Sequence, residues 1–573
     1  MPPRVMIFGL DGATFHFIRP LAMAGRLPAL ADLMARGTSG ELRSIYPPHT
    51  AAAWSTFMTG ELPGNHGVFN FYELNLTRYS RRGRPVTSDA LRGRTIFDVA
   101  SAHGLRVAAL HVPMTFPAWP INGVMFSGYP APAGSPACAY PRTLAATFGR
   151  LTGITWTRSP DKRVRWSQEH IALQTDLCEQ VLTQEAPDLF MTVYQETDWA
   201  HHYLWRYHDP RSPAYTAADA RRYGDHIALV YQALDQAIGR LLCYAGPETT
   251  IFVVSDHGGT VSAPNAFHLN AWLASQGLFV ARTEHATWLS MAFTRQLTRK
   301  LRTFPLRELK EQRFARWLLP IINPVLHLAR RAGLESLMDH IYQVHDSGAS
   351  LDPTQTRAYR FQVVTQAEGI ALNVAGRQPQ GIVQPGAEYE TLRDQIIAGL
   401  QALRTPDTDE PLMIGVYRRE EIFAGRHMEE VPDIIVRLHP LYRVGTNVQP
   451  PLFTQLRAAD VQGPLSGWHD DYGILIAAGP GIAAGVTVTG ASLLNMAPTI
   501  LHALGLSAPP WMEGTVQEGL FASKAIPVAR GSGQWTTNLP DSELGSSSED
   551  LKYEISADEE QLIEERLRNL GYL

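Results

Sequence analysis

The sequence predicts an α/β fold, because short apolar runs with the character of buried strands alternate with helical periodicity. The runs "RVMIFGL", "DLFMTVYQETD" and "TIFVVSDHGG" lead into acidic side chains at Asp11, Asp198 and Asp256. Residues 217–243 carry apolar side chains at helical spacing. Strands that alternate with helices indicate an α/β sheet. Because ligands of open α/β sheets bind beyond the carboxyl ends of the strands, we expect the three aspartates to mark one site.

The composition excludes several classes of protein. The chain has 573 residues, of which 45% are hydrophobic, so it can bury a large core. Its formal net charge of −5 gives no reason to expect nucleic-acid binding. The three cysteines, Cys138, Cys178 and Cys243, are far apart and lack metal-ligand spacing. A reduced compartment without disulfides is the simpler interpretation.

Targeting and membrane signals are weak. The apolar run that follows Arg4 ends at an aspartate and is too short for the core of a signal peptide. No stretch reaches the roughly 18 uncharged apolar residues that a membrane span needs. We therefore expect a soluble, cytoplasmic protein without a membrane span.

Changes of composition divide the chain into a core with insertions. At 283–346, bases interleaved with Leu, Phe and Trp predict a helical insert. We favour a solvated helical face packed on the core over a membrane-surface or anionic-partner role for it. Short strands, turns and a helix at 389–403 predict an α+β cap at 347–465. The expected catalytic core is then formed by 1–282 and 466–522.

The C-terminal part of the chain combines a linker with a helix. Residues 523–550 are polar and rich in Gly, Ser and Pro, which is typical of a flexible linker. Within 551–573, Ser556 and Glu559 have the spacing of a capping box. We expect a C-terminal helix that docks on the core through an apolar stripe of Ile563, Leu567 and Leu570.

Acids and histidines at the predicted strand ends indicate metal binding. Asp198 and His202 are four residues apart, so a helix that starts there would place both side chains on one face. Asp256 and His257 are adjacent, and His469 lies in a turn-like segment before a buried strand. A single strand-terminal aspartate more often caps a helix. Together with Asp11, however, the set suits a pair of divalent ions, zinc or manganese. His201 cannot face the same way as His202 and is expected to be structural.

Thr50, in "IYPPHTAAAWSTFMTG", is a candidate nucleophile. Two prolines before it force an extended approach and three alanines after it favour a helix, so we expect Thr50 to be the N-cap. A helix start attracts anions such as phosphate. A threonine hydroxyl is a weak nucleophile unless something such as a metal ion activates it. Ser55, Thr56 and Thr59 lie further down the helix and are expected to serve packing or capping.

These motifs together resemble a known family. In order, "GLDG", "YPPHTAAAWSTFMTGELPGNHG", "TDWAHH", "VVSDHGG" and "GWHDDYGILIAAGPGI" are similar to the alkaline phosphatase superfamily, within it the type I phosphodiesterase/nucleotide pyrophosphatase-like family. The stretches "NVAGRQPQGIV", "LLNMAPTILHALGL" and "RLRNLGYL" resemble a prokaryotic subgroup of it. The resemblance implies a three-layer core with a mostly parallel central sheet between helices. It spans nearly the whole chain and is weakest at 283–346.

The resemblance also implies roles for individual residues. It makes Thr50 the nucleophile, ten residues before the glycine that ends its helix, Gly60. The two metal ions, zinc or manganese, are then divided between two sets of ligands. One set is Asp11, Thr50, Asp256 and His257, and the other is Asp198, His202 and His469.

Two departures from the family pattern bear on substrate. The family places a phosphate-binding asparagine shortly after "HG", whereas Asn70 stands one residue earlier than that pattern, which puts its role in doubt. The cysteine motif of sulfatases is absent, which disfavours sulfate esters. In "GRQPQG" of the cap, Arg377 is a candidate substrate contact, and a surface arginine in a turn is an equally good interpretation.

The resulting hypothesis is metal-dependent hydrolysis of a small-molecule phosphate ester, a phosphodiester or pyrophosphate, through a phospho-threonine intermediate. A phosphomonoesterase, a phosphotransferase or mutase, and a sulfate-ester hydrolase could use the same residues. A non-catalytic binding protein is the weaker alternative, because every ligand position is filled. No residue indicates an oligomeric state.

Overall fold

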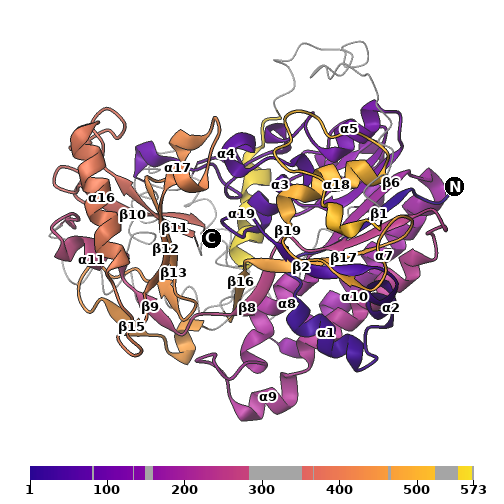
Figure 1. The fold of residues 1–573 in the computed structure, drawn as a ribbon, viewed down its shortest axis with the longest axis horizontal. Coiled ribbons are helices and arrows are strands. Elements are labelled where there is room, and N and C mark those ends of the chain that lie inside the picture. The colour runs from indigo at the N-terminus through magenta and orange to yellow at the C-terminus, as the bar shows by residue number, and fades with distance from the viewer. Residues whose placement is uncertain are drawn as a thin grey trace, which may run out of the picture.

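The computed structural model describes residues 1–79, 83–132, 134–148, 159–282, 351–364, 367–461, 466–522 and 553–570 (Figure 1). The predicted helical insert at 283–346 and the predicted linker at 523–550 lie outside these residues. No helix of the described residues combines the length and the apolar character needed to cross a bilayer.

A large sheet forms the centre of the main body. Neighbouring strands pair in parallel, except that β17 runs antiparallel to both of its neighbours and β5 antiparallel to β4. The predicted α/β fold with a mostly parallel sheet is therefore confirmed. Across the sheet, the strands are β18 (Val486–Thr487), β2 (Thr38–Arg43), β17 (Tyr472–Ala478), β7 (Thr250–Val254), β1 (Val5–Leu10), β6 (Leu189–Tyr194), β3 (Val107–Val112), β4 (Gly123–Ser127) and β5 (Ala139–Tyr140), and β19 (Ala491–Ser492) also pairs with β2.

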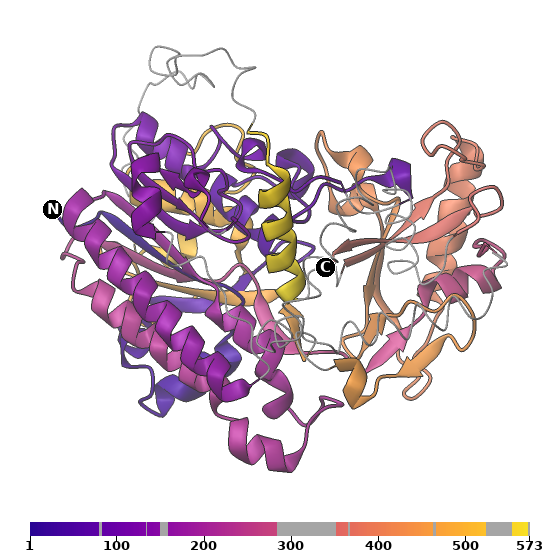
Figure 2. The ribbon, with the colours of Figure 1, turned by 180° about the vertical axis from the view of Figure 1, so that it is seen from behind.

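Helices cover both faces of this sheet (Figures 1 and 2). Because both faces are covered, the central strands β1, β6 and β7 are buried along their whole length and read as continuous apolar runs. On one side lie α3 (Thr50–Thr59), α5 (Ile96–Ala102) and α18 (Met496–Ala503), and on the other α1 (Phe15–Met23), α2 (Pro28–Arg36), α7 (Pro160–Glu185) and α10 (His226–Leu242). Shorter helices are α4 (Pro63–His66), α6 (Ala145–Phe148), α8 (Glu196–Leu204), α9 (Ala217–Tyr223) and α11 (Leu269–Ser275).

The expected helix at 217–243 is two helices. The chain breaks between α9 and α10 at Gly224 and Asp225. Thr216 caps α9 by accepting a hydrogen bond from the backbone N–H of Asp219, while the apolar stripe belongs to α10 alone. Helical periodicity located the buried face correctly and missed the break, because Gly224 is compatible with a helix backbone.

A second body contains its own sheet and its own apolar cluster (Figure 1). The helix expected at 389–403 is α16 (Ala387–Gln401), which packs beside β12. Residues of α11 join this apolar cluster, although they precede 283. The sheet has the order β10 (Ala358–Val364), β11 (Ala367–Leu372), β13 (Ile434–Leu438) and β12 (Met413–Arg418), and α17 (Arg419–Ile422) follows it. A smaller sheet joins β14 (Tyr442–Val444), β9 (Asn265–Phe267) and β15 (Phe453–Gln455). We call this second body the cap.

The C-terminal helix α19 (Ala557–Leu570) docks on the main body, at its border with the cap (Figure 2). Ser556 and Glu559 form the predicted capping box, in which each side chain bonds the other residue's backbone N–H. Ile563 and Leu567 of the predicted stripe are buried in the main apolar cluster. Glu559 also accepts a hydrogen bond of 2.6 Å from the hydroxyl of Ser135, which ties the start of the helix to the core.

Candidate active site

The carboxyl ends of β7, β1 and β6, which are neighbours in the sheet, carry the predicted aspartates. Asp11 directly follows β1 and Asp256 is the second residue after β7. Asp198 does not end a strand, because β6 stops at Tyr194 and Asp198 is the third residue of α8. The expected helical pairing with His202 on one face is present, since both lie in α8 and their side chains face each other.

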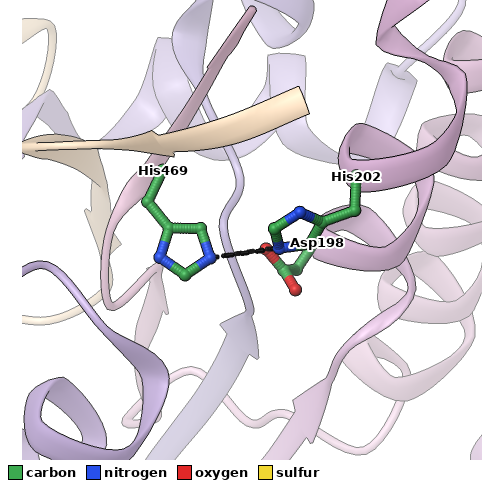
Figure 3. Close-up of side chains that lie close together, drawn as sticks. All are labelled: Asp198, His202 and His469. Carbon is green, nitrogen blue, oxygen red and sulfur yellow. Dashed lines mark hydrogen bonds and ion pairs between the residues drawn. The ribbon is translucent and has the colours of Figure 1, made fainter. Parts of the chain in front are cut away.

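One cluster of metal-ligand side chains consists of Asp198, His202 and His469 (Figure 3). The Nε2 atoms of His202 and His469 lie 3.1 Å apart. The Oδ1 atom of Asp198 is 3.3 Å from the first of these nitrogens and 3.6 Å from the second. Figure 3 shows the three side chains converging from α8 and from a strand on the opposite side.

The structure places His469 in a strand rather than in the expected turn. It lies in β16 (Gly467–Asp470), which pairs antiparallel with β8 (Gly258–Val261). Its Nδ1 atom donates to the carbonyl of Pro48 at 2.8 Å, and Nδ1 of His202 lies 3.2 Å from the carbonyl of Gly467. Carbonyls that hold Nδ1 turn Nε2 towards the cluster, which is the usual arrangement of histidines that bind a metal.

The second cluster surrounds Thr50. The Thr50 hydroxyl lies 3.4 Å from Oδ1 of Asp11 and 3.4 Å from Nε2 of His257. Nε2 of His257 is also 3.3 Å from Oδ2 of Asp256 and 3.6 Å from Asp11. Ligand atoms of Asp11, Asp198 and His257 all lie within 4.8 Å of one another. The carboxylate of Asp198 therefore belongs to both clusters, and the stacked rings of His257 and His469, 3.9 Å apart, join them.

Thr50 is the first residue of α3 and not its N-cap, so the predicted cap was wrong by one position. The N-cap is His49, whose Nδ1 accepts a hydrogen bond of 3.3 Å from the backbone N–H of Ala51. A histidine ring can take over the usual role of a serine or threonine hydroxyl there because its unprotonated nitrogen is an acceptor. Because His49 caps the helix, the hydroxyl of Thr50 can face Asp11 and His257 instead.

Several neighbours that the sequence did not single out hold Asp11 in place. The indole N–H of Trp54 donates to Oδ2 of Asp11 at 2.9 Å, and the hydroxyl of Thr197 donates to its carbonyl at 2.5 Å. Trp54 lies four residues after Thr50 on the same helix, so helical spacing could have indicated it. Gly9 leaves room for this indole, since a Cβ at Gly9 would lie 2.6 Å from the Trp54 ring.

The electrostatics of the site are those of crowded, buried carboxyl groups. Burial raises the pKa of Asp11 well above its ordinary value, and the charges of Asp256 and Asp198 raise it further. Burial likewise raises the pKa of Asp256, to about 6. Burial alone would raise the pKa of Asp198 too, but the adjacent imidazoles, His202 first, bring it below the ordinary value. Burial, and then the charge of His257, lowers the pKa of His469, which keeps this ring neutral.

The remaining polar residues of these segments are structural. His201 packs among Phe17, Trp205 and Tyr231 and faces away from His202, as expected. Ser55 and Thr59 bond the carbonyls one turn earlier in α3, and the hydroxyl of Thr56 lies 3.0 Å from Nε2 of His66.

Both predicted substrate contacts have partners within the protein. The side-chain amide of Asn70 donates to the carbonyl of Val363 at 2.7 Å, so it joins the core to the cap. Arg377 lies in a turn of the cap, where its guanidinium donates two hydrogen bonds of 2.6 Å to Asp433. Arg377 also donates to the carbonyl of Leu372, so these contacts hold the cap together. A contact of either residue with substrate stays a prediction.

Comparison with known proteins agrees with this architecture. Crystal structures of phosphonoacetate hydrolase from Sinorhizobium meliloti 1021 superpose with TM-scores of 0.52 and 0.51, at 15% identity, over 88% of this chain and 96% of theirs. Human ectonucleotide pyrophosphatase/phosphodiesterase 5 gives a TM-score of 0.47 at 13% identity, over 91% of this chain and 100% of that one. A search of curated proteins by sequence found no match. The likeness to phosphonoacetate hydrolase supports the fold.

The two Asp/His clusters offer candidate ligands for a metal ion. Residues 5–469 match the family described as type I phosphodiesterase / nucleotide pyrophosphatase. The chain belongs to this family and is a hydrolase that acts on ester bonds.

Proposed function

We propose that this protein hydrolyses a phosphodiester or pyrophosphate bond of a small-molecule substrate, with Thr50 as nucleophile and two divalent metal ions as cofactors. Asp11, Thr50, Asp256 and His257 would hold one ion. Asp198, His202 and His469 would hold the other. The observation that carries the proposal is the position of Thr50, the first residue of a buried helix. Its hydroxyl lies 3.4 Å from both Asp11 and His257.

The donor set fits divalent cations. Among the described residues, Asp11 and Asp256 form ion pairs only with histidine, so no lysine or arginine neutralises these buried carboxylates. The Oδ2 atom of Asp256 is buried without a hydrogen-bond partner in that part of the chain. Buried charges are normally paired or coordinate metals. Mixed carboxylate and imidazole ligands suit Zn²⁺, the ion we propose, and also Mn²⁺.

The chain itself supplies positioning and the nucleophile. A bound divalent ion acts as a Lewis acid on phosphoryl oxygens and lowers the pKa of an oxygen bound to it. The Thr50 hydroxyl attacks phosphorus, its proton passes to a neighbouring base, and the alcohol or phosphate leaving group departs. Asp11 and His257 face this hydroxyl and orient it. Water then cleaves the phospho-threonine ester and restores Thr50. The positive end of the α3 helix dipole would add stabilisation to the developing negative charge.

We propose that the cap selects the leaving group. It folds around its own apolar cluster and joins the main body through the hydrogen bond between Asn70 and Val363. A separately packed body can change its loops without disturbing the candidate ligands, because those ligands follow β1 and β7 or lie in α8 and β16, outside the cap.

The test is Thr50→Ala, assayed with bis-p-nitrophenyl phosphate, p-nitrophenyl phosphate and p-nitrophenyl sulfate in the presence of Zn²⁺ or Mn²⁺. We expect the wild type to favour the diester, and the variant to lose about 10⁴-fold or more of its turnover, as loss of a covalent nucleophile does. Elemental analysis should still find both ions in the variant. Full activity of the variant would refute the role of Thr50. Ser55→Ala, one turn further along α3, is the matched control and should keep its activity.

A further inference from the structure

A third cluster of polar side chains includes a residue of the C-terminal helix. It consists of Arg566 from α19, Tyr129 just after β4, and His111 in β3. In the central sheet β3 adjoins β6, whose following helix carries Asp198, and β4 adjoins β3. The cluster therefore continues the row of strand ends that holds the aspartates. We call it the Arg566 cluster.

Arg566 is a largely buried cation to which no carboxylate is paired among the described residues. One of its Nη atoms donates to the carbonyl of Ala131, and its Nε atom is buried without a partner in that part of the chain. Its guanidinium lies 5.5 Å from the ring centre of Tyr129. Glu559, an acid of the same helix, instead accepts hydrogen bonds from the hydroxyl groups of Ser135, Tyr553 and Ser556. A buried charge normally has a partner, so the missing anion calls for an explanation.

His111 adds unused hydrogen-bonding groups to the same place. It lies at an irregularity in the pairing of β3 with β4 and has a positive φ of 57°. Bulges of this kind often re-aim a side chain next to an active site. Both ring nitrogens are buried and have no hydrogen-bond partner among the described residues. Burial first, and then the positive charges of His170 and Arg566, lower the pKa of His111 to about 3. The ring is thus a neutral group with an unused N–H donor.

Tyr129 connects the cluster to the candidate active site. Its ring packs 5.2 Å from that of Phe71, which in turn packs 5.0 Å from His49, the N-cap beside Thr50. The ring of His49 is 6.2 Å from that of the metal-ligand candidate His469. The rings of Tyr129, Phe71 and His49 therefore form a chain of contacts from Arg566 to the start of α3.

We propose that the Arg566 cluster binds a second phosphoryl group of the substrate, beyond the one that Thr50 attacks. The inference rests on the proposed function and gives it a substrate class, a pyrophosphate rather than a simple diester. A guanidinium binds phosphate oxygens through charge and several N–H groups, and a neutral imidazole adds one more donor. The leaving phosphate of a pyrophosphate carries more negative charge than an alkyl leaving group, so it gains more from a cation that the metal ions do not provide.

The test compares two substrates in three variants. The substrates are ADP-ribose, which contains a pyrophosphate bond, and bis-p-nitrophenyl phosphate, which has one phosphoryl group. For Arg566→Gln we expect kcat/KM for ADP-ribose to fall at least about 10-fold, and that for the diester to change less than about 3-fold. Arg566→Lys, which keeps the charge and the stem, should lie between. Ser135→Ala, which loosens the start of α19 but leaves Arg566 intact, should not alter the ratio of the two values.

An equal change for both substrates in Arg566→Gln and Arg566→Lys would overturn the proposal, because it would show a structural role only. If the wild type cleaves neither substrate, the proposed function fails, and a separate measurement then tests the anion subsite. Inorganic phosphate is titrated by calorimetry into EDTA-treated protein, so that its affinity depends on side chains and not on metal ions. Affinity that Arg566→Gln lowers about 10-fold supports the anion subsite, and affinity that does not change refutes it. Arg4→Gln, at the opposite end of β1, is the control for loss of one positive charge.

Discussion

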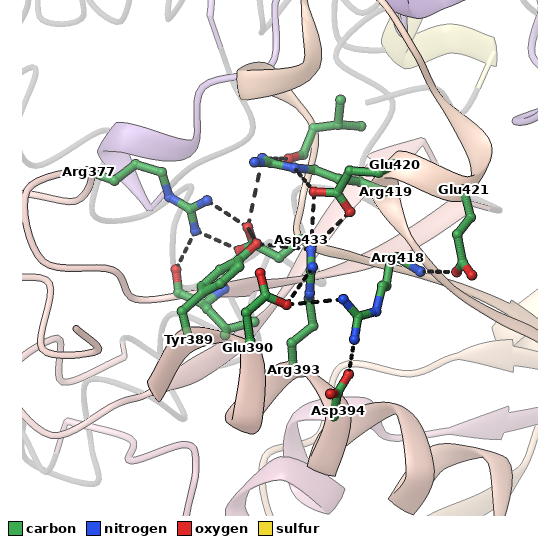
Figure 4. Close-up of polar contacts among 12 residues, drawn as sticks. Arg377, Tyr389, Glu390, Arg393, Asp394, Arg418, Arg419, Glu420, Glu421 and Asp433 are labelled. Atoms are coloured by element: carbon green, nitrogen blue, oxygen red, sulfur yellow. Dashed lines mark hydrogen bonds and ion pairs between the residues drawn. The ribbon is translucent and has the colours of Figure 1, made fainter. Parts of the chain in front are cut away.

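Two buried aspartates, Asp256 in the candidate active site and Asp433 in the cap, have the same exposed fraction of 0% and opposite surroundings. Asp433 receives two hydrogen bonds from Arg377, one of 2.8 Å from the hydroxyl of Tyr389 and one of 2.7 Å from the backbone N–H of Leu372 (Figure 4). Oδ1 of Asp256 accepts one hydrogen bond of 3.2 Å from the backbone of Gly12, and its Oδ2 has none among the described residues.

The difference shows how a buried carboxylate can serve structure or function. The network around Asp433 continues through Arg393, Arg418 and Glu390, so the charges of the cap compensate one another without a ligand (Figure 4). Burial, and then the charge of Asp256, instead raises the pKa of Asp11, and the ion pairs that Asp11 and Asp256 form among the described residues are with His257. Uncompensated carboxylates of this kind destabilise the folded protein until a cation binds. Carboxyl groups with perturbed pKa values are therefore concentrated at functional sites.

The largest effect is expected from Asp256→Asn. The substitution removes one charge from the cluster around Thr50, so the protein should bind one metal equivalent fewer and lose about 10³-fold or more of its kcat. Elemental analysis and steady-state kinetics measure the two quantities. The metal-free variant should be at least as stable as the metal-free wild type, because it lacks a crowded carboxylate. Full metal occupancy in the variant would contradict the assignment of Asp256.

Asp433→Asn should show the reverse pattern. It leaves the charges of Arg377 uncompensated in the cap, and we expect the free energy of unfolding to fall by about 3 kcal/mol, as for other broken buried ion pairs. Chemical denaturation of the metal-free protein measures this change. The folded variant should keep its metal content and its turnover of bis-p-nitrophenyl phosphate. A loss of metal without a loss of stability would remove the distinction between the two aspartates.

The smallest effect is the pH dependence of stability without metal. The pKa of Asp256 in the folded protein, about 6, lies above that of an aspartate in an unfolded chain, so the folded state holds this proton more tightly. Its contribution to stability is therefore complete at low pH and disappears as the pH rises through about 6. The melting temperature of EDTA-treated wild type should fall by a few degrees relative to Asp256→Asn between pH 5 and 7. Parallel curves for the two proteins would argue against this titration.

Much of the core and of the candidate site could be predicted from the sequence, because both depend on local patterns. Continuous apolar runs located β1, β6 and β7, and four-residue spacing located the pairing of Asp198 with His202. Two local assignments were wrong for physical reasons. His49 replaced Thr50 as the N-cap because its ring nitrogen competes for the same backbone N–H. His469 entered a strand because β8, far away in the chain, offers it a partner.

The sequence by itself indicated the candidate metal ligands and the buried strands of the core, since motifs and apolar periodicity are properties of neighbouring residues. Only the tertiary structure decided that Asp198 belongs to both clusters and that the ring of His257 stacks on that of His469. It also decided that Arg566 lies on the ring of Tyr129 and bonds the carbonyl of Ala131, 435 positions earlier. Contacts of this kind depend on how the packed elements close on one another, and no local spacing records them.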